Sequence, residues 1–141
     1  MAESIWVPPD VERVVKDHVK ALLVVRGRIC TAGLGVPSDW TTKSLDHVQV
    51  GAASAQIRKA WGPVPPIDIT GPVQLTVWSK NATDAKALAN LCLGLLIVAP
   101  VVKPLTQIVP GTGTSTTRDP RTRGELAFFN VIVSAEPVLA G

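Results

Sequence analysis

The chain has 141 residues, of which 46% are hydrophobic and 18% are charged, so it can bury the core of one domain and is not globally disordered. Its formal net charge of +3 is mildly basic, and without a concentrated basic patch it gives weak support for nucleic-acid binding. The mean hydropathy of +0.28 is high for a small chain, which indicates a sheet covered on both faces or burial against other subunits.

Targeting and membrane signals are weak. The N-terminal residues lack the basic and apolar regions of a signal peptide. The longest apolar run, Ala87 to Val102, is interrupted by Asn90, Gly94 and Pro100, so we expect no membrane span. Cys30 and Cys92 have no metal-type spacing, and we expect free thiols in a reducing compartment.

The first element is an amphipathic helix over Val11 to Val24. Two prolines and Asp10 precede it, as is common at helix starts. The predicted apolar stripe comprises Val11, Val15, either His18 or Val19, and Leu22.

Short strands and loops follow this helix. We predict strands over Val24 to Cys30, Leu45 to Val50 and Ala55 to Trp61, of which the last two form a hairpin. The segment Thr31 to Ser44 is rich in Gly, Pro, Ser and Thr and is predicted to be a loop, and Gly62 to Pro66 is a rigid connector.

The chain is organised around a strand that leads into a long apolar helix. Apolar and other residues alternate from Ile67 to Ser79, which predicts a strand with one buried face. Asn81 is a good N-cap for a helix over Ala82 to Val98, and Asp84 falls in its first turn.

The C-terminal third is predicted to be extended. It contains a short stretch at Val101 to Val109, a polar loop at Pro110 to Gly124 and a last strand at Glu125 to Glu136. We expect the loop to be flexible or to become ordered on a partner. The order of elements predicts a single α+β domain over residues 1–141, with a mainly antiparallel sheet and two helices packed on one face.

The last strand has two apolar faces. One face is Ala127, Phe129, Val131, Val133 and Ala135, and it can pack on the helices. The other face contains Phe128 and Ile132, although a solvated sheet face should be polar. Either both faces are covered within the chain, or the second face contacts a neighbouring protein. We favour the second explanation.

Chemical motifs are weak throughout the sequence. His18 and His47 belong to no metal-binding or nucleophile signature, so we expect neither catalysis nor a bound metal. The glycine pairs 33/35 and 111/113 do not lead through a lysine into a helix, which argues against a phosphate loop.

The remaining candidates are contact residues. Arg118, Arg121 and Arg123 could pair with carboxylates or phosphates of a partner. Trp6 and Trp40 lie in irregular segments, where an exposed tryptophan would be an interface anchor. With Phe128 and Ile132, these arginines and Trp40 are our candidate interface residues.

Three segments together resemble the tail terminator proteins of long-tailed, siphovirus-type bacteriophages, especially those of actinobacterial hosts. They are the helix PPDVERVVKDHVKALL, the unit DITGPVQLTVWSKNATDAKALANLCLGLL and the ending TSTTRDPRTRGELAFFNVIVSAEPV. The resemblance covers nearly the whole chain and rests on the combination, since no single motif is specific.

The resemblance implies a virion protein that forms a ring, usually of six subunits, at the head-proximal end of the tail tube. Such a ring stops tube polymerisation and joins the tail to the head, so the implied partners are copies of the chain, the tail tube protein and the head-side connector. Assembly in the host cytoplasm is implied, with no reaction, cofactor, membrane or direct nucleic-acid recognition.

Three alternatives remain open at this stage. The chain could be another head–tail connector or stopper protein. A small enzyme or ligand-binding module would need a concave pocket with convergent polar groups. A nucleic-acid binder would need the arginines of the polar loop to join Arg26, Arg28, Arg58 and Lys59 in one stripe.

Overall fold

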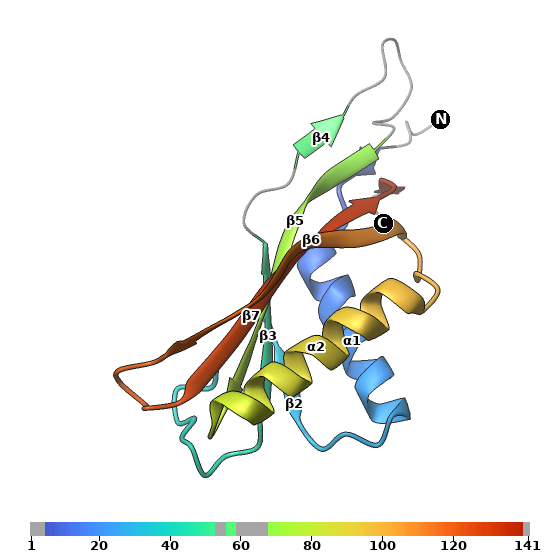
Figure 1. The fold of residues 1–141 in the computed structure, drawn as a ribbon. Helices are drawn as coiled ribbons and strands as arrows, with labels where there is room; N and C mark the ends of the chain where they lie inside the picture. The colour runs from blue at the N-terminus through green and yellow to red at the C-terminus, as the bar shows by residue number, and fades with distance from the viewer. Residues whose placement is uncertain (1–4, 53–55, 59–67, 140–141) are drawn as a thin grey trace.

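Two helices pack on one face of a mostly antiparallel sheet in the computed structural model, which describes residues 5–52, 56–58 and 68–139 (Figure 1). The helices are α1 (Val11–Val25) and α2 (Ala82–Val98). The strands are β1 (Trp6–Val7), β2 (Thr31–Gly33), β3 (His47–Ala52), β4 (Gln56–Arg58), β5 (Asp68–Ser79), β6 (Leu105–Arg118), β7 (Glu125–Ala135) and β8 (Val138–Leu139). The α+β fold predicted from the sequence is confirmed.

The main sheet has the strand order β2-β3-β5-β7-β6, and β4 pairs with the first residues of β5. All its pairs are antiparallel except β2–β3, which is parallel. A separate two-stranded sheet joins β1 to β8, so the two ends of the described chain lie side by side. The sequence pattern does not predict this small sheet, because each of its strands has only two residues.

The central unit forms as its local signals predict. The backbone N–H of Asp84 donates to the side-chain oxygen of Asn81 over 2.7 Å, and the amide of Asn81 donates back to the Asp84 carboxylate over 3.0 Å. This cap fixes the start of α2 at Ala82, as expected. The helix then buries Ala85, Leu88, Ala89, Cys92 and Leu96 against the sheet.

The first helix ends in a turn, and the strand predicted for Val24 to Cys30 is wrong. Gly27 has a φ of +72°, its N–H donates to the carbonyl of Val24, and the N–H of Arg28 donates to that of Leu23. This left-handed glycine closes α1 and turns the chain before β2, which lies inside the predicted loop. Within α1, both His18 and Val19 are buried, and Leu23 rather than Leu22 continues the stripe.

The pairing predicted for the middle strands is also wrong. β4 pairs with β5 and not with β3, so these segments do not form the expected hairpin. The strand predicted to run to Trp61 and the connector at 62–66 lie partly or wholly outside the described residues.

The core lies between the helices and one face of β3, β5 and β7. Register places Val48 opposite Val77, and Leu75 opposite both Val50 and Phe129, so every second residue of these strands faces the helices. These five side chains are all fully buried. The buried face predicted for β7 is confirmed in full.

The two adjacent phenylalanines of β7 test the assignment of one face of the strand to the core and of the other face to the surface. Phe129→Ala should lower the free energy of unfolding by about 3–5 kcal/mol, because its side chain is fully buried. Phe128→Ala should cost clearly less, since Phe128 is half-buried on the opposite face. Chemical denaturation of both variants measures the difference, and equal losses would contradict the assignment of the two faces.

Candidate assembly surface

The face of the main sheet opposite the helices is covered by no helix of the described chain (Figure 1). Rows of paired residues cross it, such as Gln49, Thr76, Phe128 and Ser115. We call this surface the open face, and define it by Gln49 on β3; Thr70, Pro72, Gln74, Thr76 and Trp78 on β5; Leu126, Phe128, Asn130, Ile132 and Ser134 on β7; and Gln107, Val109, Thr112, Ser115 and Thr117 on β6.

The open face mixes polar groups with half-buried apolar side chains. Trp78, Phe128 and Ile132 are each partly exposed, although none is among the strongly exposed large side chains. Cross-strand bonds order the polar groups. The hydroxyls of Thr70 and Ser134 lie 2.8 Å apart, and the indole N–H of Trp78 donates to Gln49 over 3.3 Å. That Phe128 and Ile132 meet a neighbouring subunit stays a prediction.

The segment predicted as a polar loop at 110–124 is mostly strand. β6 runs through Arg118 and pairs with β7 along its length, with register shifts after Leu105, Pro110 and Thr112. Each register shift breaks the alternation of apolar and polar residues from which a strand is predicted, so the sequence of β6 does not look like a strand. At Gly111 a Cβ would lie 2.8 Å from the carbonyl oxygen of Asn130, so glycine permits the close approach of the two strands.

A tight turn of 119–124 closes the β6–β7 hairpin, and we call it the tip. The carboxylate of Asp119 accepts bonds from the N–H groups of Arg121 and Thr122 and from the Thr122 hydroxyl at 2.6 Å. The Thr122 hydroxyl and these backbone N–H groups hold the pKa of Asp119 below its usual value. The tip is therefore built by its own side chains.

The three candidate arginines gather at this end of the hairpin, but they differ. Arg118 donates to Glu125 across the strands at 2.8 and 2.7 Å. Arg121 and Arg123 are exposed and make no ion pair with any described residue. Arg123 has a φ of 60°, a left-handed conformation that turns the chain back toward β7.

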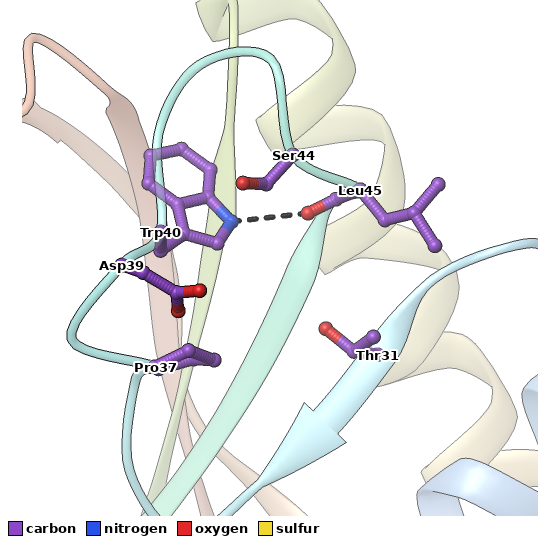
Figure 2. Close-up of a pocket in the computed structure, with 6 residues that line it drawn as sticks. All are labelled: Thr31, Pro37, Asp39, Trp40, Ser44 and Leu45. Carbon is purple, nitrogen blue, oxygen red and sulfur yellow. Dashed lines mark hydrogen bonds between the residues drawn. The ribbon is translucent and has the colours of Figure 1, made fainter.

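Trp40 is buried, and its predicted role as an exposed anchor is not supported. Only 4% of Trp40 is exposed. Its indole N–H donates to the carbonyl of Leu45 over 3.0 Å (Figure 2). Its ring meets that of Trp78 edge to face, with ring centroids 5.7 Å apart. A Cβ on Gly124 would lie 2.6 Å from this ring, so glycine at the base of the tip makes room for the indole. Trp6, by contrast, is 42% exposed.

A pocket of about 190 Å³ adjoins Trp40 (Figure 2). It is lined by Thr31, Pro37, Asp39, Trp40, Ser44 and Leu45. A more open hollow of about 480 Å³ lies beside it and shares Ser44 and Leu45. The first pocket is lined from residues 31–45 alone, whereas the second also takes Lys80 and Asp84, which are distant in the sequence. The sequence pattern predicts neither hollow.

Apolar side chains are also exposed where both helices end. Val25 closes α1 at 85% exposure, Ile29 follows at 81%, and Val98 closes α2 at 84%. Isolated exposed apolar residues are ordinary, so these side chains alone do not define an association surface. The helical patterns gave no reason to single them out.

The two histidines belong to the interior. His47 donates from Nε2 to the carbonyl of Gly35 over 2.6 Å, so its Nδ1 accepts from the Thr31 hydroxyl at 2.7 Å. Burial lowers the pKa of His47, against the opposing effect of the Gly35 bond. Burial also lowers the pKa of His18, whose Nε2 has no hydrogen-bond partner among the described residues.

Both thiols are poor nucleophiles in this environment. Burial raises the pKa of Cys92 to about 12, and Cys30 acts in the same direction. Burial likewise raises the pKa of Cys30. Because the thiolate is the reactive form, these cysteines are protonated at neutral pH.

Across residues 5–52, 56–58 and 68–139, no three His, Cys, Asp or Glu side chains are placed to hold a metal ion. Neither α1 nor α2 has the length and apolar character needed to cross a membrane.

Neither a protein-family model nor a curated protein sequence matches this chain.

The histidine pKa directions predict acid sensitivity. Below about pH 6.5, the ordinary histidine pKa, the unfolded chain binds protons that folded His18 and His47 resist, so the free energy of unfolding should fall as pH falls. His18→Leu removes one of these two imidazoles, together with its unpartnered Nε2. In this variant the free energy of unfolding should depend less on pH between about pH 5 and 7. Denaturation at several pH values measures the slope. The exposed variant Lys20→Gln should keep the native slope, and an unchanged slope in His18→Leu would contradict the prediction.

Proposed function

We propose that this chain is a structural subunit of a bacteriophage tail, forming a ring at the head-proximal end of the tail tube. The ring ends tube polymerisation and joins tail to head. One observation carries the proposal: both helices lie on one face of the sheet (Figure 1), and the open face carries the half-buried apolar side chains of Phe128 and Ile132 with no described helix over them. A surface of this kind fits association with other copies.

A second feature supports assembly. β6 is the outermost strand of the main sheet and has 14 residues, so its outer N–H and C=O groups are available for pairing. Its register shifts and Pro110, which lacks an N–H, limit indiscriminate pairing along this edge. An edge protected in this way favours a specific neighbour over open-ended aggregation.

The resemblance to tail terminator proteins provides the biological setting. It implies a ring of about six copies, with the tail tube protein below and the head-side connector above. The α+β fold agrees with that expectation. The proposal assigns the chain no catalytic reaction and no cofactor.

Electron microscopy of tails assembled without this protein tests the proposal. In a phage that encodes the chain, its removal should give tubes of uncontrolled length that fail to join heads. Tubes of normal, uniform length that attach to heads would overturn it. Uniform tubes that remain separate from heads would instead favour a connector or stopper.

The open face gives a variant that separates assembly from folding. Phe128→Asp should impair tail capping more than it lowers the unfolding temperature, because Phe128 lies outside the core between the sheet and the helices. Ala87→Asp adds the same carboxylate on the exposed side of α2 and should leave capping unchanged. Capping is scored from tail lengths and folding from thermal denaturation. A folded Phe128→Asp protein that caps normally would exclude this face as an interface.

A further inference from the structure

The turn that closes α1 is fixed by its backbone but exposed in its side chains. The three N–H groups at positions 26–28 donate to helix carbonyls over 3.0 to 3.2 Å. With the left-handed Gly27, these bonds form a Schellman-type cap. The position that is often apolar in this cap holds Arg28, and Ile29 after it is strongly exposed. The backbone therefore holds the turn in place, while its side chains are accessible to a partner.

Apolar and basic side chains are mixed in one exposed surface at this turn. We call it the α1 end patch, and it comprises Lys20, Val24, Val25, Arg26, Arg28 and Ile29. All six residues are exposed, and the exposure of 24–29 is unbroken. Lys20, Val24 and Arg28 line one small hollow of about 30 Å³, so the cations of the helix and of the turn lie close together. None of the three cations takes part in an ion pair among the described residues.

This mixture fits a partner surface that carries carboxylates around an apolar group. Arginine pairs with a carboxylate through two parallel hydrogen bonds. Contact with an apolar group removes Val25 and Ile29 from water, which favours association. Because the backbone already holds the turn, binding costs little additional ordering of the chain.

Other classes of acidic partner fit the α1 end patch less well. A nucleic acid needs a longer basic stripe, but the tip with its arginines lies on the opposite side of the domain from the end of α1 (Figure 1). A membrane-binding helix inserts a whole apolar face, whereas the stripe of α1 that contains Val15, Val19 and Leu23 is already buried in the core. The exposed apolar part is limited to the turn, which suits a local contact with a protein.

We propose that the α1 end patch is a docking site for an acidic segment of another protein. Carboxylates of that segment pair with Arg26 and Arg28, and an apolar side chain between them lies against Val25 and Ile29. Charge complementarity selects this occupant, since the patch carries three cations and no carboxylate. The contact is independent of the tail function, because it requires only the structure of this turn.

A labelled synthetic peptide with glutamates and leucines in equal number tests the site by fluorescence anisotropy on purified full-length protein. The native protein should bind it at low salt. R26E/R28E should bind it about tenfold or more weakly, because two attractive charge pairs become repulsive. R26Q/R28Q, which introduces no new charge, should also bind it more weakly. The matched control R121E/R123E changes the net charge equally at exposed arginines of the tip and should bind as the native protein does.

A second pair of substitutions separates a specific contact from a general attraction between charges. V25S/I29S keeps every charge and should weaken binding several-fold, because both side chains bury apolar area in the complex. Circular dichroism and thermal denaturation should show native folding in every variant, since all the substituted residues are exposed.

Several results would overturn the docking site. They are no binding of the peptide by the native protein, an equal loss in R121E/R123E, and native binding in V25S/I29S. Tighter binding of duplex DNA or of phosphatidylserine vesicles than of the peptide would assign the patch to a different class of partner. Self-association of the native protein that R26E/R28E abolishes would make the occupant a second copy and would likewise exclude the acidic segment.

Discussion

Strand alternation in β5 and β7 is the constraint on which the rest of the structure depends. These two strands lie at the centre of the sheet and pair over 11 positions, from Ile69 with Ala135 to Ser79 with Glu125. One set of alternate side chains is apolar except at the last pair, Ser79 and Glu125, and it packs against α2, while α1 packs on β2 and β3. A one-residue slip would move that set to the open face, so burial fixes the register and with it the position of Phe128 and Ile132.

The Trp40–Gly124 contact links two segments that are distant in the sequence. Trp40 lies in the loop before β3, and Gly124 is the last residue of the tip, directly before β7. Because the ring of Trp40 also meets Trp78 on β5, three segments share one aromatic contact. The arginines of the tip are therefore presented from a base that is packed against the body of the domain.

The sequence predicted elements that carry their own signals and missed those that depend on a partner strand. α2 begins where Asn81 caps it, and β7 has the alternation of a half-buried strand. β6 is rich in Gly and Thr and has an irregular register, so its extended form depends on the pairing with β7. Similarly, β2 has three residues and exists through its pairing with β3. Phe128 could be selected from its own strand, whereas the burial of Trp40 depends on contacts with Trp78 and Gly124, which are distant from it in the sequence.

The positions of the imidazole and thiol groups explain why the proposed function rests on surface residues. The imidazoles and thiols are buried or half-buried, and their shifted pKa values favour the neutral forms. Neutral, packed groups serve the interior, where an uncompensated charge would be costly. The charged arginines and the partly exposed aromatic groups are instead carried by β5, β7 and the tip. The proposed association would therefore depend on shape, on the exposed edge of β6 and on the charges of the tip, since the buried imidazoles and thiols are neutral.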